Sequence, residues 1–104
     1  MRAETERILE VIARELGVLS EKVVIEGHTD SRPYAGAGRY SNWELSADRA
    51  NAARRVMERG GLNPDQLAAV RGLADRQLRI PSAPLDSRNR RVSILVASGR
   101  QHGA

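Results

Sequence analysis

The chain has 104 residues, enough for one modest hydrophobic core and too few for two. Cysteine and phenylalanine are absent, so the core is expected to be aliphatic, and disulfides and cysteine-based zinc sites are excluded. The formal net charge is +4, but acidic residues are interspersed with the arginines, and the longest basic cluster is residues 88–91. Aromatic residues make up only 3%, which leaves little surface for stacking bases, so we expect no nucleic-acid partner.

The first elements predicted along the chain are a helix and a strand. Apolar residues recur at helical spacing over residues 5–19, and Gly17 indicates the end of this amphipathic helix. A strand then begins at Val23 and is expected to be interrupted at Gly27, where the missing Cβ lets another backbone or a ligand come close. No apolar run approaches the roughly 20 residues that cross a bilayer, so no membrane helix is expected in this chain.

A loop and the clearest helix follow. Residues 31–40 are rich in glycine and small residues, which is typical of an exposed loop. Ser41 and Glu44 have the spacing of a capping box, and the helix they begin is predicted to end near Arg59, before Gly60 and Gly61.

Shorter elements complete the chain. We expect a helical turn at 63–65, a strand at 69–73, a proline-containing loop, and a strand at 91–96 with Val92, Ile94 and Val96 on one face. The order helix, strand, long helix, strand, strand favours one small layered α+β domain that spans residues 1–104.

The polar residues after the first strand suggest a site for a metal, for catalysis or for a bound ligand. A metal needs three or four ligands, whereas His28 and Asp30 supply two and the other histidine is His102 in the tail, so no metal or other cofactor is expected. No serine has the setting of a hydrolase nucleophile, so no catalytic residue is assigned. His28 is expected to be a half-buried strand histidine that is hydrogen-bonded to a neighbouring loop.

The long helix adds a guanidinium to this region. Asn42, Leu45 and Arg49 share one face with the apolar residues of its second half, so Arg49 lies on the side that should be buried. Two interpretations remain open. Arg49 could form a structural ion pair with Asp30, or the two charges could line a pocket that holds a zwitterion, Asp30 taking an ammonium and Arg49 a carboxylate.

Three ordered motifs resemble the OmpA-like peptidoglycan-binding family. They are "GHTD" at 27–30, "SNWELSADRAN" at 41–51 and "NRRVSILV" at 89–96. The loop "SRPYAGAGRY" and the segment "VRGLADRQL" are similar specifically to flagellar stator subunits of the MotB type. The resemblance implies an OmpA-like two-layer sandwich with helices packed on one face of a small mixed β-sheet.

The resemblance also implies the ligand, which is the diaminopimelate-containing stem peptide of peptidoglycan. It implies that Asp30 binds the ammonium group of diaminopimelate and that Arg49 binds its carboxylate. Asn42 and Leu45 are implied to line the pocket and Arg90 to close it, with a contact from Thr29. If Arg90 has no such role, it is expected to pair with Asp86 or to lie in solvent.

Partners and location follow from the same resemblance. The domain is expected to be a non-enzymatic, periplasmic wall anchor that acts as a homodimer and works with a membrane-embedded, MotA-like stator subunit through a region absent here. Residues 1–104 are then a piece of a longer membrane-anchored protein, and the family's usual strand before the first helix has no counterpart ahead of Thr5. The first alternative is the wall-anchoring domain of another OmpA-like outer-membrane protein or lipoprotein. The second, which the mixed charge disfavours, is a basic domain that binds nucleic acid.

Overall fold

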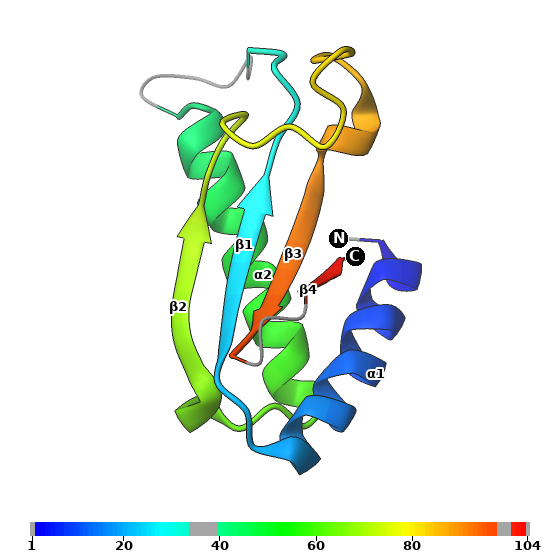
Figure 1. Cartoon of the computed structure of the whole chain (residues 1–104), viewed down its shortest axis with the longest axis vertical. Helices are drawn as coiled ribbons and strands as arrows, with labels where there is room; N and C mark the ends of the chain where they lie inside the picture. The colour runs from blue at the N-terminus through cyan, green and yellow to red at the C-terminus, as the bar shows by residue number, and fades with distance from the viewer. Residues whose placement is uncertain (1, 34–39, 98–100, 104) are drawn as a thin grey trace.

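The computed structural model describes residues 2–33, 40–97 and 101–103, the last three by their backbone path alone. These residues form two long helices and a β-sheet (Figure 1). The bounds are α1 Ala3–Leu19, β1 Val23–His28, α2 Asn42–Gly60, β2 Leu67–Gly72, β3 Arg91–Val96 and β4 Gln101–Gly103, with 3-10 turns at Pro64–Gln66 and Ser87–Asn89.

Strand β1 lies inside the sheet, whose order is β2-β1-β3-β4. It pairs in parallel with β2 and antiparallel with β3, and β4 pairs antiparallel with β3. His28 at the end of β1 is opposite Arg91 at the start of β3. Because β1 and β3 run in opposite directions, the residues that follow β1 meet those that precede β3, and this juxtaposition creates the site described below.

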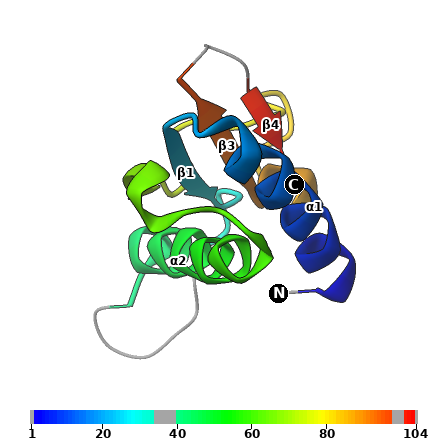
Figure 2. The ribbon, with the colours of Figure 1, turned by 90° about the horizontal axis from the view of Figure 1, so that it is seen from below.

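Both helices lie on one side of the sheet. Helix α2 packs against β1 and β2, and α1 packs along α2 (Figures 1 and 2). The buried core between the layers is aliphatic, as expected, and contains Leu9, Ala13, Leu16, Val23, Ile25, Ala50, Ala53, Val56, Met57, Leu62, Val92, Ile94 and Val96. Fully burying one large aliphatic side chain contributes about 1.5–3 kcal/mol, so this layer holds the helices to the sheet. The predicted two-layer α+β architecture is confirmed.

Gly27 brings α2 close to the sheet. A Cβ added at Gly27 would lie 2.0 Å from Ser46 O, and one at Gly72 on the neighbouring strand would lie 2.5 Å from Ala47 N. Real side chains do not approach a backbone so closely, and both positions therefore need glycine. The neighbour that the sequence suggested for Gly27 is thus the backbone of α2, which sets Arg49 beside the end of β1.

The elements differ from the sequence predictions at a few places. β1 continues through Gly27 to His28, because Gly27 pairs with both neighbouring strands, so the predicted interruption is wrong. β2 begins two residues earlier than predicted, and β4 was not predicted. Of the predicted loop at 31–40, residues 34–39 lie outside the described residues. Among the described helices, none has both the length and the apolar character required to cross a bilayer.

Candidate functional site

A cavity of about 250 Å³ opens at the carboxyl end of β1, between the beginning of α2 and the beginning of β3. We call it the Asp30 pocket. All the residues that the sequence predicted for the site are among those that line it, which are Thr29, Asp30, Arg32, Pro33, Asn42, Leu45, Arg49 and Arg90. The structure therefore brings the predicted set together from three separate segments of the chain, while contact of each residue with a ligand stays a prediction.

Asp30 supplies the negative charge of the pocket. The residue is only 5% exposed, and its Oδ1 accepts a hydrogen bond from Arg32 N at 3.0 Å. Its Oδ2 lies 3.4 Å from Arg90 Nε. A carboxylate can accept about four hydrogen bonds. These two contacts therefore leave Asp30 with acceptor capacity that a bound cation could use.

Arg49 reaches the pocket from α2. Its Nη1 donates to the main-chain oxygen of His28 at 3.2 Å, so the guanidinium is held against the last residue of β1. Burial and the nearby charge of Arg90 lower the pKa of Arg49, while Asp30 and Tyr40 act in the opposite direction. A guanidinium titrates so high that Arg49 remains cationic. Arg49 and Arg90 thus lie close to each other in a pocket that three arginines and one carboxylate line.

The ion pairs differ from those that the sequence predicted. Among the described residues, Asp30 pairs with Arg90 and not with Arg49, so the structural Asp30–Arg49 pair does not form. Asp86 pairs with Arg88 at 2.9 Å, which also makes the alternative Asp86–Arg90 pair wrong. Both differences follow from the antiparallel β1–β3 register, which puts Arg90 next to Asp30.

The beginning of α2 is fixed by local hydrogen bonds. Ser41 and Glu44 form the predicted capping box, in which Ser41 Oγ accepts from Trp43 N and Glu44 Oε1 accepts from Ser41 N. Asn42 Nδ2 donates to Arg32 O at 2.7 Å, which ties the helix to the segment after Asp30. Leu45, one turn before Arg49, forms an apolar part of the pocket wall.

Thr29 supports the strand end. It is 2% exposed, and its hydroxyl donates to the main-chain oxygen of Asp30 at 2.8 Å. Its own N–H donates to Ala74 O at 2.8 Å. The Thr29 hydroxyl thus has a partner within the chain, so its structural contribution is to hold the backbone of Asp30.

Asn89 organises the other side of the pocket, and the sequence analysis gave it no role. The fully buried side chain accepts from Ile80 N at 2.8 Å and donates to Ala83 O at 2.9 Å. The neighbouring carbonyl of Pro84 accepts from Ser31 N at 2.9 Å, which joins this loop to the end of β1. Asparagine readily bonds nearby backbone groups, and its position beside Arg90 in "NRR" was the available signal.

His28 is more buried than expected. The residue is 1% exposed, and among the described residues neither ring nitrogen has a hydrogen-bond partner. The predicted bond to a neighbouring loop is therefore wrong. Glu26 Oε1 lies 3.7 Å from Nε2, too far for a hydrogen bond. Burial and then Arg91 lower the pKa of His28, and Glu26 only partly opposes them.

The described residues contain no cluster of side chains that could form a metal site. Within residues 2–33, 40–97 and 101–103, no group of three or more histidine, cysteine, aspartate or glutamate side chains could hold a metal ion. The side chain of His102 lies outside the described residues.

A comparison with known protein families shows to which family the chain belongs. The sequence profile described as "OmpA family" matches residues 1–91. The chain belongs to the OmpA family. The family resemblance drawn from the three motifs is thereby confirmed.

Two relatives show which members of the OmpA family this domain resembles. It is 47% identical over 90 residues to Motility protein B of Escherichia coli K12, covering 86% of this chain and 29% of that protein. It is 39% identical over 70 residues to the peptidoglycan-associated lipoprotein of Pseudomonas aeruginosa, covering 67% of this chain and 39% of the lipoprotein. The chain thus spans well under half the length of these relatives.

A solved structure has the same fold. The C-terminal domain of Helicobacter pylori MotB superposes with a TM-score of 0.79 at 25% identity, over 93% of this chain and 76% of that one. The specific similarity to MotB-type proteins is confirmed by this match together with the relative from E. coli.

Proposed function

We propose that this domain binds peptidoglycan non-covalently through the diaminopimelate residue of the stem peptide. The observation that carries the proposal is the Asp30 pocket, where one carboxylate and three arginines, among them Arg49 and Arg90, line the same cavity. The side-chain end of diaminopimelate bears an ammonium and a carboxylate on one carbon. A cavity of about 250 Å³ has room for such a group but not for a whole stem peptide.

Each predicted residue receives a role in this proposal. Asp30 accepts hydrogen bonds from the ammonium, and Arg49 donates to the carboxylate, for which its planar fork is suited. Arg90 closes the pocket from the beginning of β3. Asn42 and Leu45 form its wall beside α2, and Thr29 holds Asp30 in place.

Such a pocket gives a weak individual contact. Charge-assisted hydrogen bonds contribute about 1.5–3 kcal/mol each, whereas association costs at least about 4 kcal/mol. A homodimer that engages two ligands on one polymer gains effective concentration and holds more firmly. The proposed activity is therefore anchoring by repeated weak binding, without catalysis.

For the whole protein we propose the anchoring of a flagellar stator to the cell wall. The domain would lie in the periplasm, carried by an inner-membrane protein that works with a MotA-like partner. The 47% identity to Motility protein B supports this role. The 39% identity to a peptidoglycan-associated lipoprotein supports a second candidate, a wall anchor of another kind. A membrane helix with an embedded aspartate upstream in the gene would favour the stator, and a lipoprotein signal the alternative.

Co-sedimentation with purified, diaminopimelate-containing peptidoglycan tests the binding proposal. We expect Asp30→Asn and Arg49→Gln to abolish sedimentation while circular dichroism remains that of the wild type. Asp65→Asn and Arg55→Gln are matched controls, because both residues are exposed and neither lines the pocket. Sedimentation that is absent in the wild type, or unchanged in both pocket variants, would overturn the proposal. Release of soluble muropeptides would instead indicate a hydrolase.

A further inference from the structure

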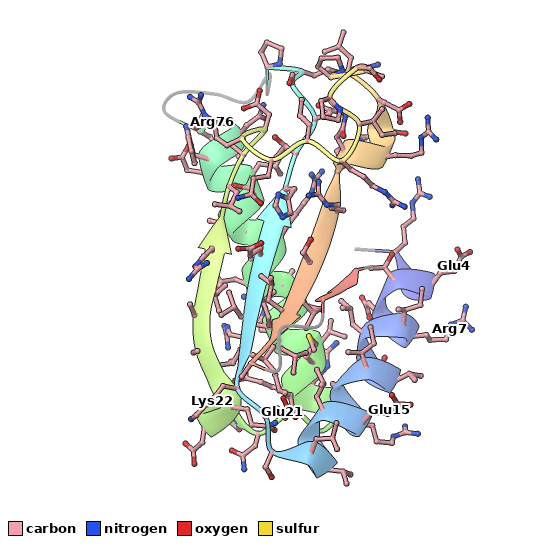
Figure 3. The ribbon with its side chains drawn as sticks, viewed as in Figure 1. Glu4, Arg7, Glu15, Glu21, Lys22 and Arg76 are labelled. Atoms are coloured by element: carbon pink, nitrogen blue, oxygen red, sulfur yellow. The ribbon has the colours of Figure 1, made fainter. Side chains whose placement is uncertain are left out.

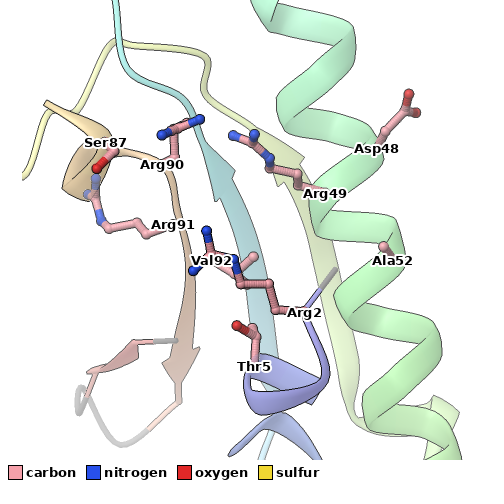
Figure 4. A pocket seen from close by; sticks show the side chains of 9 residues that line it. All are labelled: Arg2, Thr5, Asp48, Arg49, Ala52, Ser87, Arg90, Arg91 and Val92. Carbon is pink, nitrogen blue, oxygen red and sulfur yellow. The ribbon is translucent and has the colours of Figure 1, made fainter. Parts of the chain in front are cut away.

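A larger cavity adjoins the Asp30 pocket. It has a volume of about 520 Å³ and lies between the beginning of β3, α2 and the N-terminal end of α1 (Figure 4). Arg49 and Arg90 line both cavities, so the two are neighbours that share these guanidiniums. We call the larger one the arginine cavity.

The arginine cavity has an excess of positive charge. Of the residues that the structure describes, four arginines and one aspartate line it, and Thr5 and Ser87 add hydroxyls that can donate hydrogen bonds. Figure 4 shows Arg49 and Arg90 pointing toward each other across the end of β1, with Arg2 extending toward the same space. Asp48 points away from them, and its carboxylate accepts a hydrogen bond from the hydroxyl of Tyr40. The one acidic residue of the lining therefore does not neutralise the cluster.

Arg2 is the residue that distinguishes this cavity from the Asp30 pocket. It is exposed at the N-terminal end of α1, and its side chain makes no capping hydrogen bond to the helix. Within the described part of the chain no ion pair joins Arg2 to a carboxylate. Its guanidinium is thus available to a ligand that also contacts Arg90.

We infer that the arginine cavity is a second anion subsite, which binds the main-chain carboxylate of the diaminopimelate residue whose zwitterionic end occupies the Asp30 pocket. This inference rests on the proposed function. A guanidinium also binds phosphate, but a ligand that spans both cavities is one molecule, and the stem peptide supplies carboxylates. The subsite makes the domain selective for stem peptides in which this carboxylate is free.

Two synthetic stem tripeptides that end in diaminopimelate test the subsite. One has a free main-chain carboxylate and the other a main-chain amide, and both keep the zwitterionic side-chain end. We expect wild-type protein to bind the amide about 3-fold to 5-fold more weakly than the acid by calorimetry, as for an exposed charge pair. Arg2→Gln should weaken binding of the acid by a similar factor and leave binding of the amide unchanged.

The controls separate this subsite from the Asp30 pocket. Arg7→Gln changes another exposed arginine of α1, which points away from the sheet in Figure 3, and should behave as wild type. Asp30→Asn should weaken both peptides. Inorganic phosphate added at constant ionic strength should displace the acid no better than chloride does.

Four outcomes would overturn the inference. If wild type binds acid and amide equally while Asp30→Asn weakens both, the subsite is wrong and the proposed function stands. If Arg2→Gln still prefers the acid, the main-chain carboxylate binds elsewhere. The subsite is then also wrong, and the proposed function stands. If phosphate displaces the acid peptide strongly and this displacement depends on Arg2, the arginine cavity is a phosphate site and not a carboxylate subsite. Failure of wild type to bind either peptide would remove the proposed function and the subsite together.

Discussion

Arg90 Nε lies 3.4 Å from Asp30 Oδ2, and this contact joins the residue before β3 to the second residue after β1. The side chain of Arg90 is 50% exposed, whereas that of Asp30 is 8% exposed. An ion pair with one exposed partner contributes little to stability, at most about 1 kcal/mol. The position of Arg90 therefore matters more for the charge of the pocket than for the fold.

We accordingly expect Arg90→Gln to weaken peptidoglycan binding about 5-fold to 10-fold, because one cation of the pocket is lost. The midpoint of urea unfolding should change little. Arg88→Gln is the matched control, since Arg88 also pairs with an aspartate, Asp86, but lies outside the pocket. Unchanged binding by Arg90→Gln in co-sedimentation would show that Arg90 makes no ligand contact.

Gly27→Ala should disturb both stability and binding. The added Cβ would meet Ser46 O at 2.0 Å, so α2 has to move away from β1. Overpacking of this kind costs about 1–3 kcal/mol. The displacement also moves Arg49 away from Asp30, so co-sedimentation should fall even at temperatures where the variant is folded. A wild-type urea midpoint would mean that α2 accommodates the methyl group without cost.

Asn89→Ala should loosen the loop that holds Arg90. The substitution leaves Ile80 N and Ala83 O without their partner, and because both groups are half-buried, each loss costs at most about 1–3 kcal/mol. We expect lower stability in urea and weaker peptidoglycan binding. Asn51→Ala is the control, because among the described residues the Asn51 amide bonds within α2, donating to Ala47 O and accepting from Arg54 Nε. Equal effects of the two substitutions would contradict the role assigned to Asn89.

Stability should fall as the pH decreases through the range of His28. Burial and Arg91 lower the pKa of His28 below its ordinary value of 6.5, and Glu26 opposes them while also pairing with Arg71 at 3.3 Å. Below about pH 6.5 the unfolded chain therefore binds more protons than the folded one. The free energy of unfolding decreases as the pH falls from 6.5 toward the folded-state pKa.

Urea unfolding at pH 8 and at pH 5.5 measures this effect. His28→Gln should lose less stability between the two conditions than wild type, because glutamine does not titrate there. An NMR titration that gives the His28 imidazole a pKa of 6.5 or higher would contradict the sign of the prediction.

The local features of the site could be predicted from the sequence. The capping box fixed the start of α2, and the helical period placed Arg49 on the buried side next to the strand that ends at Asp30. Those signals depend on residues close together in the chain. The ion pair that forms could not be predicted, since it depends on the register of β3 against β1, which pairs segments far apart in the sequence.

The burial of His28 was mispredicted for a related reason. A polar residue at a strand end is usually exposed on one side, and its burial depends on which other segments cover that face of the sheet. The hydrogen bonds of Asn89 could not be predicted either, because a loop without regular spacing brings its partners at residues 80–84 close to it.

The inside position of β1 has a mechanical consequence for the proposed anchoring role. Asp30 is the second residue after β1, a strand that is hydrogen-bonded to β2 on one side and to β3 on the other. A pull on the ligand, directed along β1, loads both rows of interstrand bonds in shear, so that many bonds share the force at once. Had Asp30 followed an outer strand, a single row would carry the whole tension.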